Sequence, residues 1–237
     1  MPDRENAGLS AFLRSYLRPG MVVIDVGANV GDVAAVAAEC VTSSGRVIAF
    51  EASPDNARVL RGRFGTSPQV DVRHAAVSDR TGTLTLHLDA KSSKRHSLFE
   101  SAVSVRGESV TVPAVTLDDV RGELPRVDFI KIDAQGAEGR IVAGGRALLQ
   151  RDLPVVLFEL WPRGMLAAGT PPAELFEHFD ALSYRCVRLS VKGRQKSRES
   201  IDRFLASATK WACTNVIAWP PRPRPSLAHR LIRRLRA

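Results

Sequence analysis

Short strand-like segments alternate along the chain with segments of helical periodicity. Apolar, β-branched residues dominate the first of them, 22–26, and such a run is typical of a strand buried on both faces. Further strands are predicted at 46–50, 70–77, 127–134, 154–161, 185–190 and 214–220. Together they predict a seven-stranded, mostly parallel sheet.

Helices are predicted between these strands. Ser53 followed by Pro54 is a typical helix start, and this helix continues to about Phe64. Similar patterns predict helices over 33–40, 137–149 and 172–182, and an N-terminal helix within 1–20 that ends at Pro19-Gly20. Alternating strands and helices predict one α/β, Rossmann-like domain over 21–220.

The pattern changes within 83–115. Residues 83–89 and 109–115 alternate polar and apolar side chains, which is typical of antiparallel strands with one solvated face. The segment 90–108 between them is polar and irregular, and a loop of this length in a compact domain is usually functional or disordered. We therefore expect a β-hairpin insertion whose loop reaches over the functional site.

The first strand leads into a turn of small residues that includes Gly27, Ala28, Asn29 and Gly31. A strand, a glycine turn and a helix open a Rossmann-like unit, in which the backbone can approach a ligand closely. The next strand ends in Glu51, at about the separation where such folds place an acid on a ribose diol. The two features predict a ligand with an adenosine-like half.

The charges around this turn favour one kind of ligand. A dinucleotide site carries the pattern G-x-G-x-x-G, so that a helix N-terminus faces a pyrophosphate. Here Asp25 and Asp32 flank the turn, which disfavours a diphosphate and favours a ligand with positive charge. S-adenosylmethionine (SAM), with its sulfonium, ammonium and ribose groups, fits. Alternatively, the two acids merely tie down the turn and cap the helix.

Four polar residues are candidates for the chemistry. Ligands of open α/β sheets lie at the carboxyl ends of strands, where Asp133 and Glu159 occur. Lys131 shares a strand face with Asp133, and charges on such a strand are costly unless they are paired or catalytic. His96 lies in the long loop. Asp133 is the preferred base, and no metal site is predicted because Asp133 and Glu159 lack a third ligand.

Charge and composition restrict the classes of partner that we expect for this protein. The formal charge of +9 is concentrated in residues 221–237, whose six arginines leave +3 for the remainder, so a nucleic-acid partner is disfavoured. This tail is proline-rich and then basic and amphipathic, a pattern suited to weak contact with an anionic membrane. Alternatively, it is a solvated terminus or a helix docked on its own domain. The sequence shows no signal peptide or transmembrane run, and its three cysteines are widely spaced. These features predict a cytoplasmic protein, in peripheral contact with the inner face of the membrane at most.

Several motifs resemble those of the FkbM-type family of SAM-dependent methyltransferases. They are VIDVGANVGD, FEASPDN, AVSDRTGTL, SVTVPAVTLDD and IKIDAQGAE, in family order between Met21 and Leu160. The resemblance implies a class I methyltransferase fold that methylates a hydroxyl oxygen, often of a sugar, a glycolipid or a polyketide-type product. It implies cofactor contacts at Asp25, Gly27, Asn29, Gly31 and Glu51. The predicted cofactor site also includes Ala28, Ala52, Ser53, Ala76, Val77 and Asp133.

Two positions depart from the family pattern. Ala134-Gln135 follows Asp133 where Val-Glu or Val-Gln is common, and Trp161 stands where a histidine is frequent. The second departure leaves the acceptor open. Two other functions stay open as well: an RNA ribose 2′-O-methyltransferase using Lys131, Asp133 and Glu159, and a SAM-binding protein without catalysis.

Overall fold

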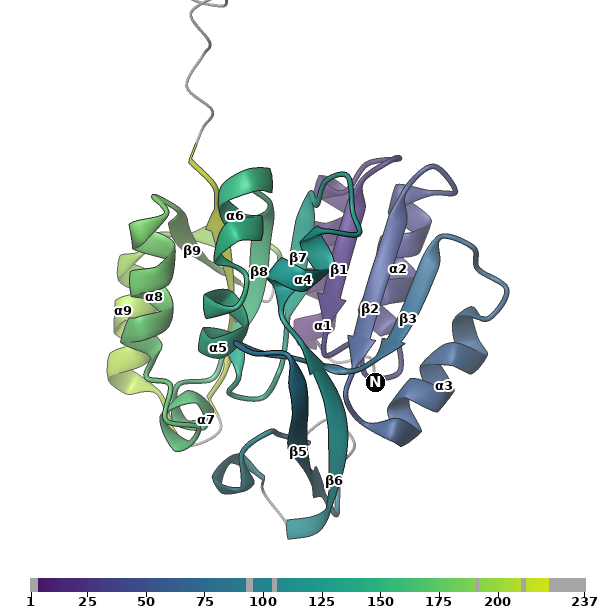
Figure 1. Cartoon of the computed structure of the whole chain (residues 1–237). Helices are drawn as coiled ribbons and strands as arrows, with labels where there is room; N and C mark the ends of the chain where they lie inside the picture. Colours follow the sequence, from purple (N-terminus) through teal and green to yellow (C-terminus); the bar gives the residue numbers. More distant parts are fainter. Residues whose placement is uncertain (1–3, 93–95, 104–105, 191, 210–211, 222–237) are drawn as a thin grey trace, which may run out of the picture.

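A computed structural model describes residues 4–92, 96–103, 106–190, 192–209 and 212–221. Within these residues, eight strands form one sheet in the order β10-β9-β11-β8-β7-β1-β2-β3 (Figure 1). Neighbours from β3 to β8 are parallel, whereas β11 is antiparallel to both β8 and β9, and β10 is antiparallel to β9. The strands are β1 (Val22–Val26), β2 (Arg46–Glu51), β3 (Val70–His74), β7 (Phe129–Ile132), β8 (Val155–Leu160), β9 (Arg185–Leu189), β10 (Gln195–Lys196) and β11 (Thr214–Trp219).

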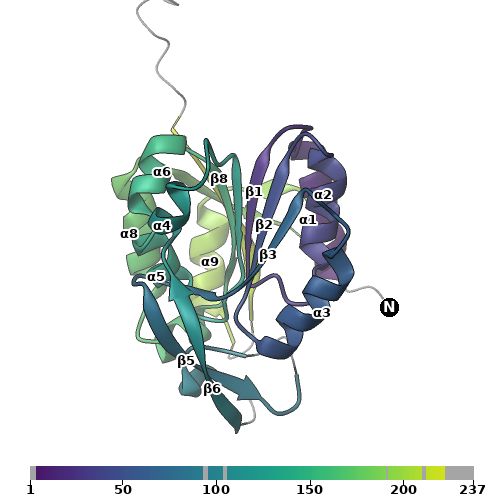
Figure 2. The same ribbon diagram turned by 45° about the vertical axis from the view of Figure 1, so that its right-hand side comes forward.

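Helices cover both faces of the sheet (Figure 2). One face packs against α1 (Arg4–Tyr16), α2 (Asp32–Val41) and α3 (Pro54–Phe64). The other packs against α4 (Leu117–Arg121), α5 (Glu138–Ala143), α6 (Arg146–Asp152), α8 (Pro172–Ala181) and α9 (Glu199–Ser207). None of the described helices is both long and apolar enough to cross a bilayer.

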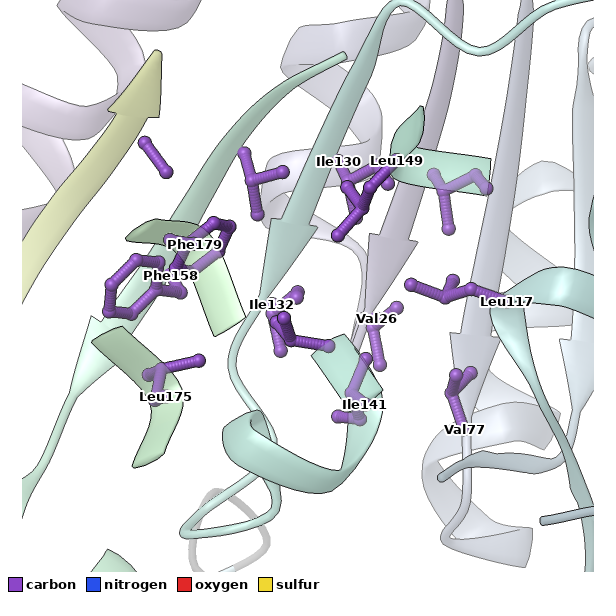
Figure 3. Close-up of a cluster of buried hydrophobic side chains, with 14 of the residues drawn as sticks. Val26, Val77, Leu117, Ile130, Ile132, Ile141, Leu149, Phe158, Leu175 and Phe179 are labelled. Atoms are coloured by element: carbon purple, nitrogen blue, oxygen red, sulfur yellow. The ribbon is translucent and has the colours of Figure 1, made fainter. Parts of the chain in front are cut away.

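The core on the second face is dominated by large aliphatic and aromatic side chains (Figure 3). Strand residues Val26, Ile130, Ile132 and Phe158 meet helix residues Leu117, Ile141, Leu149, Leu175 and Phe179. Each of these side chains is nearly inaccessible to solvent, and complete burial of one contributes about 1.5–3 kcal/mol. The same apolar runs that predict buried strands therefore fix the carboxyl ends of β1, β7 and β8 relative to one another.

A second, three-stranded sheet extends from the carboxyl edge of the main sheet (Figure 1). Strands β5 (Gly82–Asp89) and β6 (Arg106–Val115) form an antiparallel hairpin, and β4 (Ala76–Val77) pairs with β6 in parallel. The predicted hairpin insertion is thus confirmed. Between its strands lies a short 3-10 helix, η1 (Glu100–Ala102), which contacts α7 (Pro162–Ala167).

Three predicted elements differ from the structure. The strand predicted over 70–77 breaks at Ala75, whose N–H donates to Arg73 O (3.1 Å), and the chain then enters the second sheet as β4. The helix predicted over 137–149 divides into α5 and α6 at Gly144-Gly145. A Cβ on Gly144 would lie 2.2 Å from Ser78 O, so this break permits a close backbone approach.

The third difference concerns the basic segment 192–203, which the sequence predicts as a connection. It contains β10, the eighth strand of the sheet, and the start of α9. Ile201 is fully buried and Phe204 packs against the same core, but charged neighbours obscure this apolar stripe in the sequence. The predicted basic tail lies outside the described residues from position 222 onward.

Candidate active site

A cavity of about 240 Å³ lies at the carboxyl ends of β1, β2, β7 and β8, beneath the insertion. All four predicted catalytic residues line it: Lys131, Asp133, Glu159 and His96. So do most of the predicted cofactor residues, namely Gly27, Ala28, Asn29, Glu51, Ala52, Ala76, Val77 and Asp133. Asp25, Gly31 and Ser53 do not line the cavity.

The glycine turn forms one wall, and its geometry requires glycine at two positions. Gly27 has a φ of +72°, and a Cβ there would lie 1.9 Å from the carbonyl oxygen of Asp133. Gly31 has a φ of +90°, and its Cβ would lie 2.6 Å from Leu60 Cδ1. Gly31 is therefore needed for packing against α3, and its predicted cofactor contact stays a prediction.

Glu51 holds this turn through both carboxylate oxygens. Oε2 accepts the N–H of Asn29 at 2.7 Å, and Oε1 accepts the N–H of Ser53 at 2.8 Å. Burial raises the pKa of Glu51, and these two amides partly offset that effect. Ser53 itself caps α3, with Oγ accepting the N–H of Asn56, so its side chain supports the helix instead of lining the cavity.

Asn29 places a buried acceptor in the wall of the cavity. Its backbone is left-handed, with a φ of +51°. Its Oδ1 is buried and has no hydrogen-bond partner among the described residues. A buried acceptor without a donor is costly, so this atom marks a place where a bound molecule can donate a hydrogen bond.

Lys131 joins the turn to the strand ends from below. Its Nζ donates to Gly27 O at 3.1 Å and lies 3.4 Å from Asp25 Oδ1 and 3.6 Å from Asp133 Oδ2. Burial alone would lower the pKa of Lys131, but the charges of Asp25 and Asp133 raise it overall. Asp25 is fully buried beside this ammonium group, and burial raises its pKa. Asp25 therefore supports the turn from beneath, and its predicted cofactor contact stays a prediction.

Gln135 links the two candidate carboxylates. Its Nε2 donates to Asp133 Oδ1 at 3.0 Å and to Glu159 Oε2 at 3.3 Å. Its backbone is left-handed (φ +48°), and its carbonyl accepts a hydrogen bond from Ser97 Oγ of the insertion at 2.9 Å. The sequence alone does not predict this bridging role. The only indication of it in the sequence is that a polar residue stands two positions after Asp133, the acid at the end of β7.

The pKa of Glu159 is raised well above its ordinary value. Burial is the largest cause, and the negative charges of Asp133 and Glu138 add to it. His96 is half-buried, and its Nδ1 accepts the N–H of Asp89 at 2.9 Å. Burial lowers the pKa of His96, so the imidazole is neutral at neutral pH.

Glu138 fastens the turn that carries Gln135. Its Oε1 accepts the N–H of Ala134 at 2.9 Å, and its Oε2 accepts the N–H of Gly136 at 3.1 Å. Glu138 is almost completely buried, and burial raises its pKa to about 7. Its carboxylate therefore fixes the position of Gln135 between the two candidate carboxylates.

The raised pKa of Glu138 predicts a pH-dependent stability. Between an ordinary value near 4.5 and about 7, the folded protein holds a proton that the unfolded chain has released. This contribution is fully present below pH 4.5 and is lost as the pH rises to 7, by up to about 3 kcal/mol. Glu138→Gln should therefore flatten the decline in the free energy of unfolding between pH 5.5 and 8, as measured by urea titration. Equal declines in wild type and variant would contradict this assignment.

The sheet order, the glycine turn and the acid at the end of β2 define a class I methyltransferase fold, whose methyl donor is SAM. The chain belongs to the FkbM methyltransferase family, because the model of the methyltransferase FkbM domain matches residues 25–186. The family resemblance and the fold class predicted from the sequence are thereby confirmed.

A known protein with a similar sequence is also named as a methyltransferase. The chain is similar to the 2-O-methyltransferase NoeI of Sinorhizobium fredii (strain NBRC 101917 / NGR234), with 29% identity over 150 residues. The match covers 56% of this chain and 61% of that relative, which is less than two thirds of its length.

Two solved structures share the fold. The precorrin-6y C5,15-methyltransferase from Geobacter metallireducens gives a TM-score of 0.51 at 13% identity, covering 93% of this chain and 90% of the other. A putative rRNA methylase from Clostridium thermocellum gives 0.56 at 8% identity, covering 93% and 98%. At these identities the similarity concerns the fold alone.

Proposed function

We propose that the protein is a SAM-dependent O-methyltransferase whose acceptor is a hydroxyl group of a sugar, a glycolipid or a polyketide-type product. One observation carries the proposal. Asp133 and Glu159, bridged by Gln135, lie in the same cavity as the glycine turn and Glu51. A carboxylate pair opposite a cofactor cradle suits deprotonation of a hydroxyl. The name of the relative NoeI, a 2-O-methyltransferase, supports an oxygen acceptor.

The cavity residues fit SAM. The absence of a Cβ at Gly27 leaves the turn close to Asp133, and Asn29 Oδ1 is a buried acceptor that awaits a donor. The Glu51 carboxylate accepts two backbone amides and a side-chain hydrogen bond from Asn56, and a carboxylate has about four acceptor positions, which leaves room for a ribose hydroxyl. When bound, SAM supplies an electrophilic methyl group on a sulfonium.

Asp133 is the proposed base. Its carboxylate accepts the proton of the acceptor hydroxyl, while Gln135 fixes one of its oxygens and Lys131 provides a counter-charge. Burial raises the pKa of Glu159, and Gln135 holds its Oε2, so Glu159 orients the acceptor by hydrogen bonding. Alignment of this kind supplies roughly 7–11 kcal/mol of the barrier reduction in well-oriented reactions.

His96 is less suited to the role of base. An imidazole that accepts a backbone N–H at Nδ1 carries its own proton at Nε2. In this tautomer neither ring nitrogen of His96 is free to accept a proton from the acceptor. We therefore assign it to orientation of the acceptor.

Purified protein with SAM should methylate at least one member of a panel of monosaccharides, glycolipids and macrolides. The measurement is release of S-adenosylhomocysteine, with methylated product identified by mass spectrometry. An RNA oligonucleotide belongs in the same panel. Transfer to RNA ribose in place of every small molecule would overturn the proposed acceptor class, and absence of transfer to any acceptor would favour a non-catalytic SAM-binding protein.

Glu51→Gln should weaken binding of S-adenosylhomocysteine by about 1–3 kcal/mol, the usual cost of an impaired hydrogen bond to a charged group. The amide can no longer accept at both ends, so either the ribose contact or the hold on Asn29 is lost. Isothermal titration calorimetry measures the change, with NAD as the control ligand. Tight binding of NAD without binding of S-adenosylhomocysteine would contradict the proposed cofactor.

A further inference from the structure

In addition to the first cavity, a second cavity of about 420 Å³ lies between η1 and α7. The same two chain segments form both. Ser97 and Glu159 line the first cavity, whereas Ser101 and Trp161 line the second. Ser101 Oγ donates to Ala167 O at 2.6 Å, which ties the insertion to α7 across the floor of this second cavity, here called the acceptor groove.

We propose that the acceptor groove binds the part of the acceptor that lies away from the reacting hydroxyl, and that it selects a sugar carrying a phosphate or carboxylate group. This inference rests on the proposed function. Trp161 lies two residues beyond Glu159, a separation of about 7 Å along an extended chain. A hydroxyl held at Glu159 therefore places the adjoining part of the same molecule beside Trp161.

The groove offers an apolar surface for a sugar ring. A Cβ on Gly164 would lie 2.0 Å from Trp161 Cε3, so the indole ring is held closely against the Gly164 backbone. Trp161 is 8% exposed, and Ala102 and Ala167 add small apolar side chains. Rigid aromatic and small apolar groups suit the C–H face of a sugar, at low cost in conformational entropy.

The charge of the groove selects an anion. Arg163 is exposed on the groove wall and forms no ion pair with any described residue. Within the described part of the chain, no acidic side chain lines the groove. A guanidinium group binds carboxylate or phosphate through two parallel hydrogen bonds, which a neutral hydroxyl does not reproduce. The groove is therefore complementary to an anionic sugar.

The test compares glucose 1-phosphate and glucuronate with neutral methyl glucoside, titrated calorimetrically into full-length protein saturated with S-adenosylhomocysteine. Wild type should bind both anionic sugars more tightly than the neutral one. Arg163→Gln should weaken binding of the anionic sugars roughly 10- to 100-fold and leave the neutral sugar unchanged. Ala167→Phe should fill the groove and weaken all three.

Arg185→Gln is the matched control, because Arg185 is an exposed arginine at the start of β9 that does not line the groove, and it should change nothing. The inference is overturned if Arg163→Gln binds the anionic sugars like wild type, if the neutral sugar binds equally well, or if neither anion binds protein that holds S-adenosylhomocysteine. Failure of S-adenosylhomocysteine itself to bind would instead contradict the proposed function.

Discussion

Asp133→Asn should lower the rate of methyl transfer about 10²–10⁴-fold, the usual contribution of a positioned base. The asparagine side chain has the same shape, and its oxygen can still accept the hydrogen bond from Gln135 Nε2. Lys131 keeps its contacts with Asp25 and with Gly27 O. The variant should therefore fold and should bind S-adenosylhomocysteine with nearly unchanged affinity.

Turnover is measured with the acceptor identified from the panel, and affinity by calorimetry. Glu159→Gln is the matched control. Burial raises the pKa of Glu159, and an amide has the same shape as a carboxyl group and can still hydrogen-bond the acceptor. We expect this control to retain turnover within about 10-fold of wild type, well short of the loss of a base. A larger loss of turnover in Glu159→Gln than in Asp133→Asn would indicate that Glu159 is the base and that Asp133 orients the acceptor.

Gly27→Ala should abolish cofactor binding and destabilise the fold. The added Cβ would lie 1.9 Å from the carbonyl oxygen of Asp133, so the ends of β1 and β7 would have to separate. Overpacking of this kind costs about 1–3 kcal/mol. The φ of +72° adds roughly 1–2 kcal/mol for a residue with a side chain. Urea unfolding and calorimetry with S-adenosylhomocysteine measure the two effects.

Substitutions at two further glycines distinguish the steric cost of the added Cβ from the backbone cost of the positive φ. Gly62→Ala lies within α3, where an added Cβ meets no atom within 4 Å, and it should raise stability slightly through helix propensity. Gly169→Ala also meets open space, but its φ of +70° imposes the backbone cost alone. If Gly27→Ala loses no more stability than Gly169→Ala and still binds the cofactor, the close approach to Asp133 is not required.

The sequence predicts those parts of the fold that depend on local patterns. Apolar runs locate the buried strands, and the alternation over 83–89 locates the hairpin. The break at Ala75 was missed because a transfer between two sheets leaves the local apolar pattern intact. The division between α5 and α6 depends on the approach of Gly144 to Ser78, a contact between distant segments.

The site shows the same division between local and long-range information. Glu51 and Asp133 were predicted because strand-end acids are visible in the sequence. The position of Asp25 before the glycine turn predicts a ligand contact, whereas its pairing in register with Lys131, on a strand more than 100 residues away, is not visible in the local sequence. Gln135 was noted as a departure from the family pattern, yet its bridging role depends on a left-handed backbone that its sequence neighbours do not reveal.

The place of β11 in the sheet constrains how the protein is made. This strand follows every other strand of the sheet in sequence, yet it lies between β8 and β9. Until the ribosome has added Trp219, β9 and β10 lack the hydrogen-bonding partner that connects them to the rest of the sheet. Most of the sheet can assemble during synthesis, but the edge that carries β9 and β10 has to wait for the last strand to insert.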